Sequence, residues 1–138
     1  MDRTVIEQKL ESLRLCLARI TAKCPADVED LECDVDAQDI LSLNLTRAVQ
    51  ICVDVAAHLI ASREIPAPDT MGQAFDALAN AGIVDAMLAR RMKKAVGFRN
   101  IAVHNYNAID WHIVHNICRR HLDDFRDFAV CILNQEPL

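Results

Sequence analysis

The sequence predicts an all-α domain, an up-and-down bundle of about five helices, and three features favour that class. Glycine and proline account for only 3 and 4 of the 138 residues, so few positions would interrupt a helix. Aromatic residues make up 4% of the chain, whereas strands are enriched in aromatic and β-branched residues. Hydrophobic residues reach 52% and recur three and four positions apart, which is the spacing of amphipathic helices. We therefore expect residues 1–138 to form a single helical domain.

Local signals place the ends of these helices. Pro25 cannot continue a helix, so the first helix ends before it, and an acidic connector follows over residues 24–36. Thr70 and Gln73 form a capping-box pattern, and Asp110 is an N-cap residue type in front of an apolar run. The five helices are expected over residues 3–22, over residues 37–62, from Thr70 to Asn80, from about Val84 onward, and from Asp110 to Glu136-Pro137.

Hydropathy and cysteine spacing indicate a cytoplasmic protein. No run of about 18 uncharged apolar residues occurs, so the sequence predicts no membrane span. The first residues carry both signs of charge without a continuous apolar run, which does not match a signal peptide. The six cysteines show no CxxC spacing, which argues against disulfides or a zinc site. Four of them lie in apolar helical patterns and are expected to be small buried hydrophobes, namely Cys16, Cys52, Cys118 and Cys131.

The net charge of −5 argues against a general nucleic-acid coat protein, but the charge is unevenly distributed. Residues 1–80 hold 7 basic and 14 acidic side chains, whereas residues 81–138 hold 8 basic and 6 acidic ones. From residue 90 to residue 121 the chain has seven Lys or Arg and one acidic residue. Such a local positive field can bind a polyanion, although a solvated basic face is the simpler interpretation.

The segment richest in chemistry is GFRNIAVHNY, residues 97–106, which combines a cation, an amide, a histidine and a phenol. Arg99 and His104 are five residues apart, so an ideal helix would hold them about 140° apart around its axis. The helix must therefore end or loosen near His104 if the two side chains are to act together, and the turn formers Asn105 and Asn107 favour such an end. The simpler alternative makes Arg99 a surface charge, His104 a partner of a backbone group and Tyr106 a core ring.

FRNIAVHNY resembles the Arg-x4-6-His signature of HEPN domains, in the form Arg-Asn-x-x-x-His-x-Tyr that is typical of HepT-like toxins. The likeness extends beyond the motif. RAVQICVDVAAHLI, residues 47–60, resembles the long second helix of that family, and residues 68–100 resemble its third and fourth helices. The resemblance covers about residues 38–133, and the extended block with its tyrosine is much more specific than a lone Arg-x4-His.

The resemblance implies a homodimeric, metal-independent endoribonuclease that needs no cofactor, with two motifs facing each other across a cleft. Arg99 would hold the scissile phosphate, His104 would act as general acid or base, and Asn100 would orient His104 or the phosphate. HepT-like toxins pair with a small nucleotidyltransferase antitoxin of the MntA type, which adds AMP to the motif tyrosine, here Tyr106. The alternative that the family allows is a non-catalytic HEPN subunit that binds a nucleotide or a partner in a nucleotidyltransferase complex. A dimer with a vestigial site is a third reading.

Other polar residues are candidates for lesser roles. Four basic side chains, Lys93, Lys94, Arg119 and Arg120, are expected to contact the RNA backbone. His112 and His115 share a helical face, but no nearby Cys or Glu completes a tetrahedral set, so we expect surface or cleft histidines and no metal. Asp54 and His58 are four residues apart, which predicts an intrahelical hydrogen bond more readily than a catalytic pair.

Overall fold

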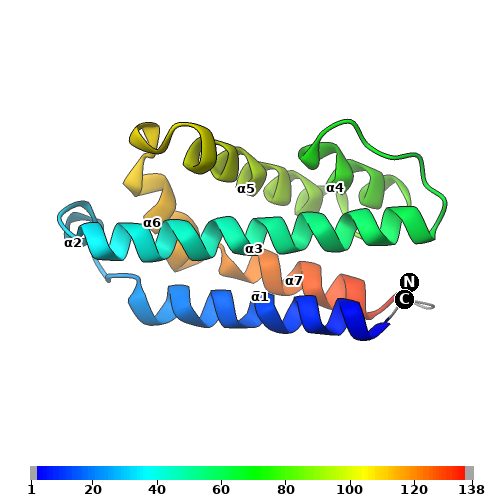
Figure 1. The fold of residues 1–138 in the computed structure, drawn as a ribbon, viewed down its shortest axis with the longest axis horizontal. Helices are drawn as coiled ribbons and strands as arrows, with labels where there is room; N and C mark the ends of the chain where they lie inside the picture. The colour runs from blue at the N-terminus through cyan, green and yellow to red at the C-terminus, as the bar shows by residue number, and fades with distance from the viewer. Residues whose placement is uncertain (1–2, 136–138) are drawn as a thin grey trace.

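Seven α-helices and one short 3-10 helix make up residues 3–135, the part of the chain that this computed structural model describes (Figure 1). No strand occurs in these residues, so the predicted all-α class is confirmed. The elements are α1 (Arg3–Lys23), α2 (Val28–Glu32), α3 (Val35–Ser62), α4 (Met71–Asn80), α5 (Ala86–His104), η1 (Tyr106–Ala108), α6 (Trp111–Arg120) and α7 (Leu122–Leu133).

The described residues contain two more α-helices than the five that were predicted. The acidic connector contains the short helix α2, whose Leu31 is fully buried and ties the connector to the core. The last predicted helix is two helices, because the chain changes direction at His121. No Gly or Pro marks this break; α6 packs on α2, whereas α7 packs on α5. Helix α7 ends at Leu133, and the predicted end at Glu136-Pro137 lies outside the described residues.

The predicted caps are confirmed by hydrogen bonds at the helix starts. The Thr70 hydroxyl accepts from the backbone N–H of Gln73 at 3.2 Å, and the Asp110 carboxylate accepts from that of His112 at 2.9 Å. Helix α3 begins two residues earlier than expected, because Asp34 caps it by accepting from Ala37 N–H at 3.1 Å. Each cap satisfies a backbone donor that has no partner within its helix.

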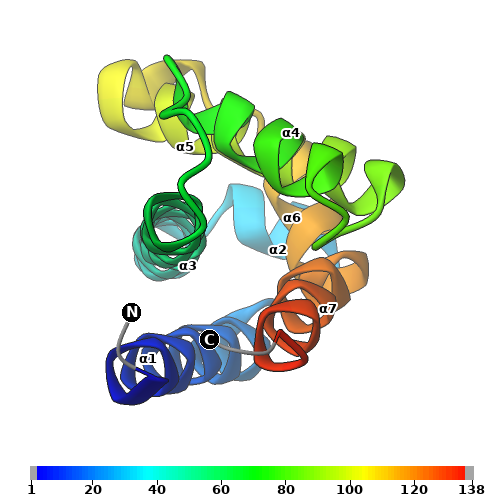
Figure 2. The same ribbon diagram turned by 90° about the vertical axis from the view of Figure 1, so that its right-hand side faces the viewer.

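Helix α3 lies in the middle of the bundle, with α1 and α7 on one side and α4 and α5 on the other (Figures 1 and 2). The sequence analysis found no candidate membrane span, but α3 is long and apolar enough to be one, with a mean hydropathy of 1.4 in its most apolar window. More than half of that window is buried against the other helices, as in the core helix of a bundle. Its first turn and the end of α5 lie at the same end of the molecule, at the left of Figure 1.

The core depends on an aromatic pair between α4 and α7. The rings of Phe75 and Phe128 meet edge to face with centroids 5.6 Å apart, and both side chains are fully buried. We expect Phe128→Ala to lower the free energy of unfolding by about 3–5 kcal/mol, because it removes ring contacts and leaves a cavity. Denaturant unfolding measures this loss. Val130→Ala, at a 55% exposed position of the same helix, should change stability by less than about 0.5 kcal/mol. Equal effects of the two substitutions would contradict this account.

Candidate active site

The candidate site is built where α5 ends and the chain turns through η1 toward α6. The last backbone bond of α5 joins Asn105 N–H to the Ile101 carbonyl at 2.8 Å, so the helix continues through His104 and stops there. Asn105 then leaves the helical conformation, with φ −152° and ψ 69°. This ending agrees with the prediction that the asparagine-rich segment terminates the helix.

Arg99, five residues before the end of α5, has a buried N–H group without a hydrogen-bond acceptor. The side chain is half-buried, and its Nε is buried with no hydrogen-bond partner among residues 3–135. One terminal nitrogen, Nη1, donates to Asn100 Oδ1 at 3.1 Å. A buried N–H without a partner costs about 1–3 kcal/mol, so such groups are rare unless a ligand or a partner chain supplies an acceptor.

His104 is exposed and forms no hydrogen bond or ion pair within the described residues. Because α5 is helical throughout, its side chain lies about 140° around the axis from that of Arg99. The helix ends at His104 but does not loosen before it. A single chain therefore does not bring the guanidinium and the imidazole to the same face. The simpler alternative, in which His104 is held by a backbone group, is wrong for this chain.

Tyr106 is the first residue of η1, and its hydroxyl donates to Asp39 Oδ1 on α3 at 2.7 Å. Its ring meets the Trp111 ring edge to face, with centroids 6.0 Å apart. The side chain is 41% exposed, so the alternative of a core ring is wrong. Burial, together with the hydrogen bond and negative charge of Asp39, raises the pKa of Tyr106 to about 12.

Asp39 is the functional candidate that the sequence did not reveal. It lies 67 residues from Tyr106 and stands among several acidic residues near the start of α3. Nothing in its local pattern separates it from Asp34, which caps the helix, or from the exposed Asp36. Only the packing of α3 against the α5–η1 segment singles it out.

The predicted RNA-binding residues do not form one continuous surface. Lys93 is paired with Asp76 on α4 at 2.9 Å, which reduces its availability to phosphate. Its neighbour Lys94 is exposed. Arg119 and Arg120 are also exposed, but they lie at the end of α6, which carries the chain away from the motif.

His112 and His115 on α6 contact the segment around α2. His115 Nε2 is 2.9 Å from the Pro25 carbonyl, and His112 Nε2 is 3.4 Å from Glu32 Oε1, so α6 is joined to the segment around α2. No group of three or more His, Cys, Asp or Glu side chains suited to a metal ion occurs within residues 3–135.

Of two other sequence predictions, one is wrong and one is correct only in part. The expected Asp54–His58 bond is wrong, because Asp54 instead accepts from Gln50 at 3.0 Å and lies 3.8 Å from Lys9 Nζ. All six cysteines are free, as predicted. Three of them are buried, two are half-buried, and Cys33 is exposed.

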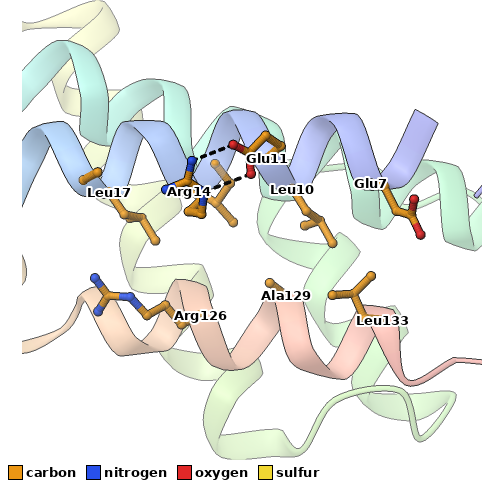
Figure 3. Close-up of a pocket in the computed structure, with 10 residues that line it drawn as sticks. Glu7, Leu10, Glu11, Arg14, Leu17, Arg126, Ala129 and Leu133 are labelled. Atoms are coloured by element: carbon orange, nitrogen blue, oxygen red, sulfur yellow. Dashed lines mark hydrogen bonds and ion pairs between the residues drawn. The ribbon is translucent and has the colours of Figure 1, made fainter. Parts of the chain in front are cut away.

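Two of the grooves on the described part of the chain are mainly apolar. One, of about 450 Å³, separates α1 from α7 on the side of the bundle opposite α5; Leu10, Ala129 and Leu133 line it (Figure 3). The other, of about 530 Å³, lies between α5 and α6 and is lined by Phe98 and Ile113 among others. Gly97, Phe98 and Ile101 of the motif segment line this second groove, whereas neither Arg99 nor His104 lines either one.

Comparisons with known proteins agree on one family. A family model described as ribonuclease HepT-like matches residues 13–132. The mRNA nuclease HepT of Shewanella oneidensis is 32% identical over 124 residues, which cover 90% of this chain and 92% of that protein. A crystal structure of a toxin–antitoxin with AMP-PNP contains a chain that superposes with a TM-score of 0.91 at 30% identity, covering 96% of this chain and all of that one. The tri-AMPylated Shewanella oneidensis HEPN toxin in complex with MNT antitoxin superposes with a TM-score of 0.90 at 31% identity, covering 98% of this chain and all of that one.

The Tyr106–Asp39 contact can be tested directly, because Tyr106 is the only tyrosine. Asp39→Asn removes the negative charge that opposes ionisation of the phenol, whereas burial, the largest cause of the shift, remains. We expect the Tyr106 pKa to fall part of the way from about 12 toward 10, so more tyrosinate absorbance appears at a given alkaline pH. Asp36→Asn, which removes a charge from the first turn of the same helix, is the matched control. Identical titration curves for Asp39→Asn and wild type would contradict the contact.

Proposed function

The chain belongs to the HepT-like ribonuclease family, and we propose that it is the toxin of a toxin–antitoxin pair that acts by cleaving RNA. The relatives that support this are named as an mRNA nuclease and as a HEPN toxin bound to its antitoxin. The observation that carries the proposal is the unsatisfied Nε–H of Arg99 in the motif, a buried cationic donor that lacks an acceptor. A phosphodiester supplies an acceptor of the complementary charge.

Arg99 binds the scissile phosphate in this proposal. Its planar guanidinium stays charged and can donate two parallel hydrogen bonds to phosphate oxygens. Asn100 fixes the guanidinium plane by accepting from Nη1 at 3.1 Å, which leaves Nε and the other terminal nitrogen for the phosphate. The same donors stabilise the negative charge that grows on phosphorus-bound oxygens during the reaction.

His104 moves the protons. One imidazole removes the proton of the ribose 2′-hydroxyl, whose oxygen attacks phosphorus as the bond from phosphorus to the 5′-oxygen breaks. A second imidazole, in its protonated form, gives a proton to the departing 5′-oxygen. The products are a 2′,3′-cyclic phosphate and a free 5′-hydroxyl, and no metal or cofactor enters the balance.

A second copy of the chain completes this site. Within one chain Arg99 and His104 lie on different sides of α5, so a pocket lined by both needs a second surface. The motif also exposes two apolar side chains on different sides of α5, Ile101 and Val103, at 44% and 50%. A homodimer that pairs the two α5 ends places two histidines in one cleft and covers the apolar side chain that faces the partner.

Exposed basic residues on α5 and at the end of α6 attract RNA to the protein, although they do not form one continuous surface with the motif. Lys94 on α5 is exposed, and Arg119 and Arg120 extend the positive charge along α6. These contacts are electrostatic and independent of sequence, so they position the substrate without choosing the bond that is cut. Lys93 contributes less, because Asp76 already neutralises it.

A nucleotidyltransferase antitoxin of the MNT type silences the toxin by adding AMP to Tyr106. The phenol is 41% exposed and lies in η1 directly after the motif, where an attached nucleotide would occupy the space of the RNA. The added phosphate also places negative charge where the RNA phosphate binds. Toxin, antitoxin and RNA meet in the cytosol, where the free cysteines remain reduced.

The ribonuclease proposal makes a prediction about the motif. Arg99→Ala and His104→Ala are each expected to lower the rate of RNA cleavage by at least about 100-fold, with the circular dichroism spectrum unchanged. A fluorescently labelled RNA measures the rate, and excess EDTA should leave the wild-type rate unaffected. Arg14→Ala and His58→Ala remove the same residue types from exposed positions outside the motif and should retain full activity. If wild type cleaves no RNA, the chain is instead a binding subunit without catalysis.

The silencing proposal predicts a covalent change. Co-expression with the partner nucleotidyltransferase should increase the mass of the chain by whole AMP units, and fragmentation should place the addition on Tyr106. RNA cleavage by the modified chain should be lost. Tyr106→Phe keeps the ring beside Trp111 but removes the acceptor oxygen, so it should gain no AMP. An unmodified wild-type mass in the presence of active partner and ATP would reject this mode of silencing.

A further inference from the structure

The Tyr106–Asp39 hydrogen bond joins η1 to the first turns of α3, across 67 residues of sequence. The hydroxyl of Tyr106 donates to Asp39 Oδ1 at 2.7 Å, which is a short distance typical of a bond to a charged oxygen. Asp39 is exposed and Tyr106 is partly buried at 41% exposure, so water can reach both groups and the bond is not needed to satisfy a fully buried one. Because exposed polar contacts contribute little to stability, we consider a role for this pair in a reaction of Tyr106.

We propose that Asp39 is the catalytic base for modification of Tyr106, accepting the phenolic proton as the hydroxyl becomes an AMP ester. This inference rests on the proposed function, in which Tyr106 is the AMP acceptor. It adds that the toxin itself, and not only its partner, supplies part of the machinery for its own silencing.

The step balances with ATP as the AMP donor. The Tyr106 oxygen attacks the α-phosphorus of ATP, and a new oxygen–phosphorus bond forms while the bond to the pyrophosphate oxygen breaks. The electron pair of that bond leaves with pyrophosphate. The phenolic proton passes to Asp39 Oδ1, to which it is already hydrogen-bonded, and then to water, which the exposed Asp39 contacts. Phosphoryl transfer to a hydroxyl is assisted in the same way by the aspartate of protein kinases.

The local geometry leaves the attacking oxygen free. The proton of the hydroxyl points to Asp39, so the lone pairs of the oxygen are directed elsewhere. Trp111 restrains one side of the ring through an edge-to-face contact, and 41% of the side chain is open to solvent. The phenol is therefore held in one orientation with an accessible nucleophilic oxygen.

Unassisted ionisation of this phenol is unfavourable. Its pKa is raised to about 12, chiefly by burial, so very little phenolate exists near neutral pH. Other charged or titratable groups on the flanking elements are Arg99 and His104 on α5, and Asp110 and His112 around the start of α6. Among the described residues only Asp39 is hydrogen-bonded to the phenol. A base that takes the proton during the attack removes the need for free phenolate.

The test measures the rate of AMP transfer to the purified chain by its partner nucleotidyltransferase with magnesium and ATP, followed by intact mass at several pH values. We expect Asp39→Asn to lower the rate about 100-fold near neutral pH. Without the base the reaction depends on free phenolate, so the rate of the variant should rise about tenfold per pH unit relative to wild type. Asp39→Glu retains a carboxylate and should recover part of the rate with the wild-type pH profile.

Asp36→Asn is the matched control, since it removes an exposed carboxylate from the first turn of the same helix and should react like wild type. Circular dichroism confirms that the variants are folded. If wild type is modified at Tyr106 and Asp39→Asn reacts equally fast with a parallel pH profile, the role of Asp39 is rejected while the proposed function stands. If wild type gains no AMP, the silencing proposal and this inference both fail.

Discussion

The backbone hydrogen bonds of α5 determine how the motif can work. Helical bonding persists to the Asn105 N–H, so every side chain of the motif keeps the angular position that the helix assigns to it. Arg99 then lies half-buried toward the other helices while His104 lies in solvent. The helical backbone therefore holds the Cα–Cβ bonds of the two residues about 140° apart around the axis. Chemistry that uses both side chains therefore depends on a second molecular surface, which makes assembly part of the proposed activity.

The burial of Arg99 illustrates a conflict between folding and function. An N–H left without an acceptor destabilises the folded chain, and a simple apolar residue would avoid that penalty. The bundle tolerates it because the core elsewhere is densely packed, with α3 contacting α1, α4 and α5 along its length. The destabilisation is located in the motif, where an anion can relieve it, as expected for a binding site that is prepared before its ligand arrives.

Much of this arrangement was predictable because it is local. The periodicity placed the helices, the Thr70 and Asp110 caps were correct, and the asparagines marked the end of α5. The break at His121 was not predictable, since apolar spacing continues across it and only the different partners of α6 and α7 require it.

Contacts between residues far apart in the sequence could not be predicted either. Asp39 could not be identified because its relation to Tyr106 spans 67 residues and depends on how α3 meets η1. The pairing of Lys93 with Asp76 was hidden for the same reason. Residue types and spacing thus located the motif, whereas packing determined which of its neighbours can act on it.

The hydrogen bond of Tyr106 has a further consequence, because it exists only while the phenol keeps its hydrogen. An ester oxygen cannot donate, and a phosphodiester beside the Asp39 carboxylate adds a repulsion between like charges. In the proposed scheme, modification of Tyr106 would therefore remove its hydrogen bond to Asp39, which links η1 to α3. Any second AMP would then have to be added without the Tyr106–Asp39 hydrogen bond that was present for the first.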